Sequence, residues 1–274
     1  MKTLQLSDGT VVPVLGQGTW TMGDRAADRA DEVRALKTGI DLGMTLIDTA
    51  EMYGAGAAEE VVADAIASRR DEVFIVTKVY PHNATRRGLP AACERSLRRL
   101  RITSIDLYLL HWRTATTQLG EMVEAFERLR DAGKIRRWGV SNFDSADLEE
   151  LDRPDCVVDQ VLYNPEHRGI EHDLLPWCGR HDIAVMAYSP LGQGRLVENA
   201  VLAKVASRHQ ATPAQVALAW ALRQRRMMAI PKARKIAHVR ANAAALDLRL
   251  EPQDLAMIDR AFPPPQQKER LQML

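Results

Sequence analysis

The chain has 274 residues, of which 46% are hydrophobic and 27% charged, a composition typical of a globular protein with a large core. Its 37 lysines and arginines nearly balance 36 acidic residues. This near-balance of charge indicates no strongly basic surface that would bind nucleic acid or an anionic membrane, so neither is expected as a partner. Three cysteines without C-x-x-C spacing argue against disulfides and a zinc site, and with no apolar run of membrane-spanning length they predict a cytoplasmic protein.

The first residues predict a β-hairpin. Residues 4–12 alternate apolar and polar side chains around Asp8-Gly9, a dipeptide that accepts the positive φ of a tight turn.

Short apolar segments then alternate with amphipathic ones. The predicted strands cover residues 15–19, 45–47, 73–78, 105–110, 135–140, 157–161, 183–187 and 227–230. The predicted helices cover residues 28–42, 57–68, 87–100, 121–130, 145–151, 171–180, 200–209, 213–223, 236–246 and 252–261. A strand and its crossover helix take about 30 residues, and the polar residues that end successive strands recur at about that spacing. The pattern predicts an α/β fold, a closed (β/α)₈ TIM barrel with an N-terminal β-hairpin, in a single domain of residues 1–274.

Polar residues end most of these strands. They are Asp48, Lys78, His111, Ser141, Asn142, Gln160 and Tyr188. Each residue alone is better explained as a cap or a turn residue. In a barrel, however, the carboxyl ends of all strands meet at one mouth, so the shared register predicts a single pocket.

The residues after the second strand indicate proton chemistry. A charged Lys78 at the end of an apolar strand needs a counter-ion, and Asp48 on the neighbouring strand is the expected one. An ammonium beside a phenol stabilises the phenolate, so we expect Lys78 to lower the pKa of Tyr53 from about 10. Tyr53 is then a candidate general acid, and His111 is placed to orient a carbonyl oxygen toward it.

Aromatic residues near the strand ends are expected to wall the pocket and bind substrate. They are Trp20, Tyr80 and Trp112, beside His111. The site has no evident nucleophile of its own, so a hydride has to come from a cofactor.

Seven segments closely resemble the aldo-keto reductases. In order, they are DTAEMYG (48–54), VTK (76–78), LLHW (109–112), GVSNF (139–143), DQV (159–161), YSPLG (188–192) and IPK (230–232). The resemblance extends from about residue 4 to residue 242, and the chain looks most like bacterial members that act on methylglyoxal and other short aldehydes.

The resemblance implies an NADPH-dependent carbonyl reductase without a metal, with a tetrad of Asp48, Tyr53, Lys78 and His111. It implies that Ser141, Asn142 and Gln160 hold the carboxamide, and that Tyr188 stacks on the nicotinamide. By the same resemblance, Ser189, Pro190, Leu191, Gly192 and Gln193 cover the pyrophosphate. The remaining cofactor contacts are Gly18, Thr19, Asp48, Ile230, Pro231, Lys232, Ala233, Arg234, His238 and Asn242, of which those from Lys232 onward cradle the 2′-phosphate.

The sequence departs from the family at two cofactor positions. Family members often carry serine directly after the lysine and arginine six residues past it, whereas this chain has Ala233 and His238. NADH is therefore expected to serve as a weaker cofactor. The tail at 262–274 is short, which indicates an open pocket for small carbonyls, and we expect a monomer.

Three other readings compete. No G-x-G-x-x-G and no Y-x-x-x-K pair is present, which argues against other nicotinamide folds. A metal-dependent hydrolase would use Asp48 and His111, or Glu166 and His167 with Glu171 and His172. The non-enzymatic alternative is a nucleotide-binding regulatory subunit on the same barrel, against which the intact tetrad speaks.

Overall fold

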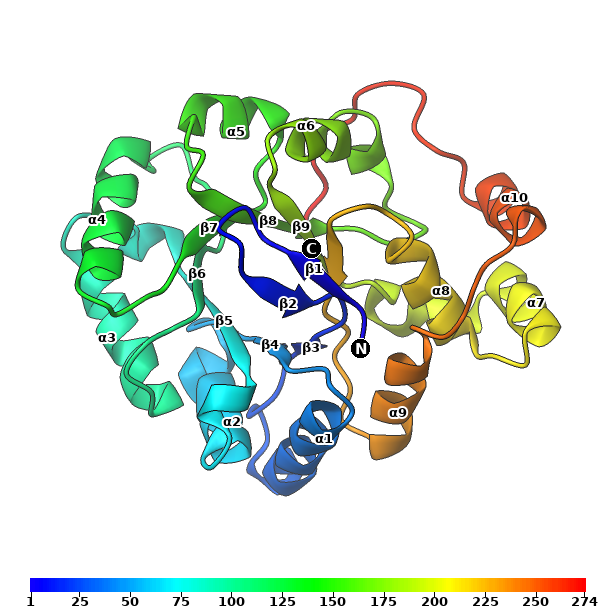
Figure 1. Cartoon of the computed structure of the whole chain (residues 1–274), viewed down its shortest axis with the longest axis horizontal. Coiled ribbons are helices and arrows are strands. Elements are labelled where there is room, and N and C mark those ends of the chain that lie inside the picture. The colour runs from blue at the N-terminus through cyan, green and yellow to red at the C-terminus, as the bar shows by residue number, and fades with distance from the viewer.

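A computed structural model describes residues 1–274 and consists of a barrel of eight parallel strands ringed by helices (Figure 1). In sheet order the strands are β10 (Met227–Ala229), β9 (Ala184–Tyr188), β8 (Cys156–Leu162), β7 (Trp138–Ser141), β6 (Leu107–Leu110), β5 (Phe74–Val79), β4 (Leu46–Asp48) and β3 (Gln17–Gly18). Parallel bridges from Leu15 to Ala229 and from Gly18 to Lys232 join the two outer strands. The predicted (β/α)₈ fold is confirmed.

Ten α-helices follow the strands, with bounds close to those predicted. They are α1 (Arg29–Asp41), α2 (Ala57–Ile66), α3 (Gly88–Leu100), α4 (Leu119–Asp131), α5 (Ser145–Leu151), α6 (Leu174–Arg180), α7 (Ala200–Arg208), α8 (Pro213–Ala221), α9 (Ile236–Ala244) and α10 (Pro252–Ala261). The helix predicted at 171–180 begins later, because the Asp173 side chain accepts a hydrogen bond from the Leu174 N–H and caps the helix there.

Three predicted strands begin more than one residue later than expected. The first, predicted at 15–19, is β3 at Gln17–Gly18, with Leu15 in an isolated bridge. The other two are also shortened at their starts. Ile105 and Ile135 pair with each other only as an isolated bridge, so β6 and β7 begin at Leu107 and Trp138. The shortening leaves the carboxyl ends of both strands, where the polar residues stand, at the predicted register.

The N-terminal hairpin is also confirmed. Its strands β1 (Thr3–Gln5) and β2 (Val11–Pro13) pair antiparallel, and Gly9 takes φ +86° in the turn, which an L side chain rarely adopts. Leu6 and Val12 are buried and join the cluster that fills the barrel interior. The hairpin therefore covers the end of the barrel at which the strands begin (Figure 1).

The strand side chains divide into two cores. The interior cluster contains residues of strands β4–β6 and β8–β10, including Leu46, Val76, Leu107, Val158 and Met186. A larger cluster of 59 buried residues packs the outer faces of the strands against the helices. The barrel is thus filled below its mouth, which leaves the carboxyl ends of the strands as the place for a site.

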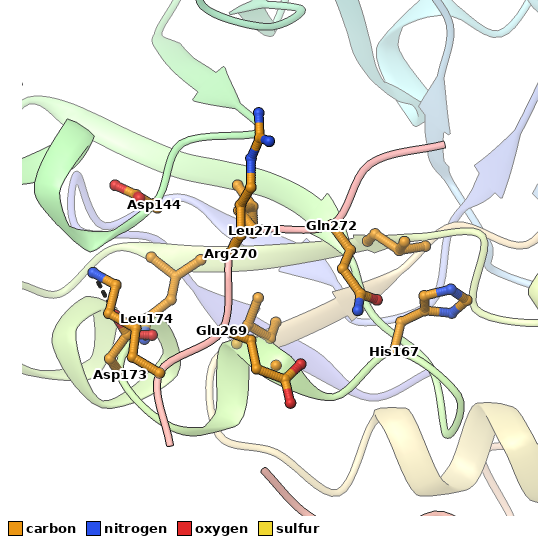
Figure 2. Close-up of a pocket in the computed structure, with 12 residues that line it drawn as sticks. Asp144, His167, Asp173, Leu174, Glu269, Arg270, Leu271 and Gln272 are labelled. Atoms are coloured by element: carbon orange, nitrogen blue, oxygen red, sulfur yellow. Dashed lines mark hydrogen bonds and ion pairs between the residues drawn. The ribbon is translucent and has the colours of Figure 1, made fainter. Parts of the chain in front are cut away.

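The C-terminal tail returns from α10 along α6 toward the barrel centre (Figure 1). Lys268 Nζ lies 3.0 Å from both an Asp173 carboxylate oxygen and the Ser145 hydroxyl, and the following residues pack beside α6 and His167 (Figure 2). At its end, the Leu274 N–H donates to the Tyr188 hydroxyl at 3.4 Å. The tail is short, but it reaches the mouth, so the expectation of a pocket left open on that side is wrong.

No helix of the chain combines the length and the apolar character needed to cross a bilayer.

Candidate active site

Asp48 and Lys78 form a buried ion pair at the barrel mouth. Asp48 ends β4, Lys78 lies near the end of the adjacent β5, and neither side chain is more than 3% exposed. Lys78 Nζ lies 2.7 and 2.8 Å from the two carboxylate oxygens of Asp48 and 2.9 Å from the Thr49 carbonyl. Burial acts to lower the pKa of Lys78, but the Asp48 charge, the Tyr53 phenol and the hydrogen bonds to both together outweigh it and raise that pKa above its ordinary value. The predicted counter-ion is confirmed.

Tyr53 brings its phenol to the same ammonium, with its hydroxyl 3.3 Å from Lys78 Nζ. The loop that places it runs through three successive positive φ values, at Gly54, Ala55 and Gly56. Glycine adopts this conformation at little cost, while Ala55 adds local strain of the kind found at functional sites.

The expected lowering of the Tyr53 pKa is wrong. Burial raises this pKa above the ordinary phenol value, the charge of Lys78 opposes the rise only in part, and the negative charge of Asp48 adds to it. Tyr53 therefore holds its proton throughout the neutral range, as a proton donor must.

His111 follows β6, continues its hydrogen bonding through its backbone N–H to the Val79 carbonyl, and is 9% exposed. Its ring lies edge-on to the Tyr53 ring, with centroids 5.7 Å apart. Burial, and secondarily the charge of Lys78, lowers the pKa of His111 to about 2. The imidazole is neutral at ordinary pH, and its Nδ1 is buried without a hydrogen-bond partner within the protein.

The depressed pKa of His111 predicts a specific loss of stability in acid. The unfolded chain takes up this proton below its reference pKa of about 6.5, whereas the folded chain does not, so stability falls as pH drops from about 6.5 toward 2. The contribution approaches about 1.4 kcal/mol per pH unit. Urea unfolding from pH 7 to pH 4.5 should show a shallower fall for His111→Gln than for the wild type. Parallel curves would contradict this assignment.

Amide and hydroxyl groups surround the tetrad. Gln160 Nε2 donates to Asp48 Oδ1 at 2.7 Å, Asn142 Nδ2 donates to the His111 carbonyl at 3.0 Å, and Ser141 Oγ donates to the Gln160 carbonyl at 2.8 Å. The Tyr188 hydroxyl donates to Asn142 Oδ1 at 3.0 Å. The structure thus gathers at one mouth the four residues that the resemblance assigns to the nicotinamide end of the cofactor.

One of the three predicted wall aromatics, Trp112, lies beside His111, and a second, Tyr80, packs against Trp112. The Trp112 ring lies 5.0 Å from the His111 ring and 5.9 Å from the Tyr80 ring, edge-on in both cases. Trp20, in the loop after β3, is 48% exposed and makes no ring contact with the other two.

The loop after β9 has the backbone conformation of a ligand-binding loop. Ser189 and Gln193 take φ +46° and +55°, and the buried Asn164 fixes the loop by donating to the Ser189 carbonyl at 2.9 Å. Pro190 and Gly192 are buried, whereas Gln193 is exposed. Strained non-glycine residues of this kind gather where a loop has to hold a defined shape.

The predicted 2′-phosphate residues lie after β10. Lys232, Ala233, Arg234 and His238 line a groove of about 430 Å³ that they share with the loop after β3. Ile230 and Pro231 are buried at its base, and Gly18 approaches so closely that a Cβ there would lie 2.7 Å from the Ile230 carbonyl. Thr19 is buried and donates to the Asp48 carbonyl. Asn242 is buried on α9 and does not line the groove.

Sequence reasoning missed Glu51. Its carboxylate is 5% exposed and accepts hydrogen bonds from the Tyr80 N–H and from Asn83 Nδ2, both at 2.9 Å, while Arg95 lies 3.3 Å away. Glu51 therefore ties the loop that bears Tyr80 to the loop that bears Tyr53. The sequence contained one signal that could have identified Glu51, namely an acidic residue between Asp48 and Tyr53.

Both glutamates proposed for the metal alternative are engaged in ion pairs. Glu166 pairs with Arg195, and Glu171 pairs with Arg168 and Arg223. No group of three or more histidine, cysteine, aspartate or glutamate side chains is placed to hold a metal ion.

The donor set fits a nicotinamide dinucleotide with a 2′-phosphate. Amide side chains and a tyrosine ring lie at one end, a tight loop lies in the middle, and cationic side chains lie at the other end.

Three comparisons agree with these features. Methylglyoxal reductase YeaE of Escherichia coli is 51% identical, with 100% of this chain and 99% of the relative covered. Glyoxal reductase of Bacillus subtilis is 35% identical, with 94% and 91% covered. An aldo-keto reductase of Klebsiella pneumoniae, solved in complex with NADPH, is 51% identical and superposes with a TM-score of 0.97 over 100% of this chain and 99% of its own. The model of the Aldo/keto reductase family matches residues 14–262. The resemblance is confirmed, and the chain belongs to the aldo/keto reductase family.

Proposed function

We propose that this chain reduces small aldehydes and ketones, such as methylglyoxal or aromatic aldehydes, to alcohols with NADPH. One observation supports this most directly: a protonated Tyr53 stands 3.3 Å from a buried, charged Lys78 and beside a neutral His111. These groups can give a proton to a carbonyl oxygen, and the mouth around them has the polar groups that a nicotinamide ring requires.

The cofactor proposal rests on the relatives as well as on the site. The E. coli relative is named for methylglyoxal reduction, and the K. pneumoniae structure contains NADPH. In this chain the groove after β10 presents Lys232, Arg234, Lys235 and His238, which is the charge that a 2′-phosphate needs. NADH lacks that phosphate and is proposed as the weaker cofactor.

The residues divide the work of the reaction. When bound, NADPH supplies the hydride that reaches the carbonyl carbon. Tyr53 donates its hydroxyl proton to the carbonyl oxygen, which completes the alcohol, and Lys78 stabilises the phenolate that remains. His111, being neutral, donates a hydrogen bond that holds the oxygen beside the phenol. Asp48 keeps Lys78 charged and fixed in place.

We propose that the substrate is small. Tyr80 and Trp112 wall one side of the mouth, and the tail fastened by Lys268 crosses another, where Leu274 contacts Tyr188. A bulky ligand would have to displace the tail, whereas a three-carbon aldehyde would not.

A carbonyl panel tests the substrate and cofactor together. We expect larger kcat/KM values for methylglyoxal and benzaldehydes than for a ketosteroid, and larger values with NADPH than with NADH. Assaying each carbonyl with both cofactors separates the two claims. A ketosteroid preferred over methylglyoxal would contradict the proposed pocket.

We further propose that the chain works as a cytoplasmic monomer of one domain, residues 1–274, without a nucleic-acid or membrane partner. Its three cysteines are buried and unpaired, as in proteins of reducing compartments.

A further inference from the structure

The groove after β10 has two walls of opposite charge. One wall bears Lys232, Arg234, Lys235 and His238, and the other bears Asp24, Asp28 and Glu32 together with a single cation, Arg25. A groove built only to receive a phosphate would have no use for the acidic wall, since like charges repel at short range.

The two walls are already joined by an ion pair. The Arg234 guanidinium contacts the Asp28 carboxylate, with Arg25 Nε at 3.8 Å from the same carboxylate. The Asp28 side chain is only 21% exposed, and that of Arg234 is 41% exposed. Asp28 therefore already pairs with the guanidinium that a bound 2′-phosphate would contact.

The remaining groups of the acidic wall differ in how firmly they are held. Glu32 is 2% exposed and accepts a hydrogen bond from the Gly23 N–H at 2.9 Å, so it is fixed in the wall. Lys232 Nζ contacts the Thr21 hydroxyl at 3.0 Å and remains available to an anion. Asp24 is exposed and makes no ion pair. Asp28 alone combines direct contact with a cation and a place in the groove.

We propose that Asp28 is a specificity-determining residue that competes with the 2′-phosphate of NADPH for Arg234. The inference rests on the proposed function and adds a residue that works against NADPH. When the phosphate binds, Arg234 exchanges one anion for another, and the released carboxylate faces the phosphate. NADH has a hydroxyl at that position, so Asp28 does not oppose it. Asp28 thereby lowers the ratio of NADPH affinity to NADH affinity.

Asp28→Asn tests the proposal because it removes the charge and keeps the shape. The Asp28 side chain caps no backbone group of α1, so the variant should fold. We expect NADPH to bind about two- to fivefold more tightly, the range of a partly exposed ion pair, and NADH affinity to change by less than about twofold. Dissociation constants come from quenching of tryptophan fluorescence, and 2′,5′-ADP against 5′-ADP isolates the phosphate from the nicotinamide.

Asp31→Asn is the matched control. Asp31 lies on the same helix but pairs with Arg34 outside the groove, so its variant should bind both cofactors as the wild type does. In an Arg234→Gln background, Asp28→Asn should raise NADPH affinity little, because the guanidinium for which Asp28 and the phosphate compete is absent.

Two results would overturn the inference. If Asp28→Asn weakened NADPH binding, Asp28 would orient Arg234 rather than compete for it. If Asp28→Asn tightened the binding of NADPH and of NADH equally, the substitution would act through the overall charge of the groove and not through the 2′-phosphate. A wild type that bound neither cofactor would instead contradict the proposed function, so the two failures are distinguishable.

Discussion

Replacing Tyr53 with phenylalanine is expected to lower kcat by at least about 10²-fold with methylglyoxal, the loss typical of removing a general acid. The change removes one proton donor and little volume from a phenol held 3.3 Å from Lys78 Nζ. NADPH affinity, measured by fluorescence quenching, should stay nearly unchanged, because the phenol acts on the substrate oxygen.

Tyr108→Phe is the matched control for that variant. The Tyr108 hydroxyl is buried without a hydrogen-bond partner, and its ring packs against Phe126 in the outer core. Its loss should leave kcat and stability close to those of the wild type. A Tyr53→Phe enzyme that kept most of its turnover would contradict the assignment of the proton donor.

The pH profile gives a second view of the same residue. Because burial raises the pKa of Tyr53 above the ordinary phenol value of about 10, the donor should stay protonated up to that range. The rate should therefore fall only as pH rises through the Tyr53 pKa.

The second large effect concerns the buried pair of Asp48 and Lys78. Lys78→Met leaves an uncompensated carboxylate in the core, which typically costs about 3–5 kcal/mol of stability, and it removes the charge that stabilises the phenolate. Asp48→Asn leaves Lys78 buried without its counter-ion, and because of this we expect the variant to lose activity as well. In the double variant both charges are gone, so the losses in kcat and in unfolding free energy should fall well short of the combined single losses.

Urea unfolding and steady-state kinetics on all four forms measure this coupling. Lys134→Met serves as the control, since Lys134 and Glu94 form a pair at 3.0 Å whose side chains are 40% and 44% exposed, and such pairs contribute about 0–1 kcal/mol. Single effects that combine without coupling would show that Asp48 and Lys78 do not act as a unit.

The sequence predicted the barrel well because its signals repeat. Most of the apolar strands end in a polar residue and lead into an amphipathic helix, so an error at one boundary does not alter the topology. The predicted partnership of Asp48 and Lys78 held for a simple reason: a charge at the end of a buried strand needs a neighbour, and the order of the strands supplies it.

Features that depend on distances between remote segments could not be predicted in the same way. The sign of the Tyr53 pKa shift depends on how deeply the phenol is buried and on the opposing charges of Lys78 and Asp48. The contact of Leu274 with Tyr188 could be predicted only if the path of the tail past α6 were known. The ion pair of Asp28 with Arg234 joins segments from opposite ends of the chain. Spacing and composition contain none of these distances.

The most direct test of the central claim follows the nicotinamide absorbance when methylglyoxal is added to the purified chain with NADPH. The account predicts that one NADPH is consumed for each carbonyl reduced, at a rate that a chelator leaves unchanged and that Tyr53→Phe nearly abolishes. Tight NADPH binding without consumption, across the whole carbonyl panel, would contradict it and would point to a nucleotide-binding regulatory subunit instead.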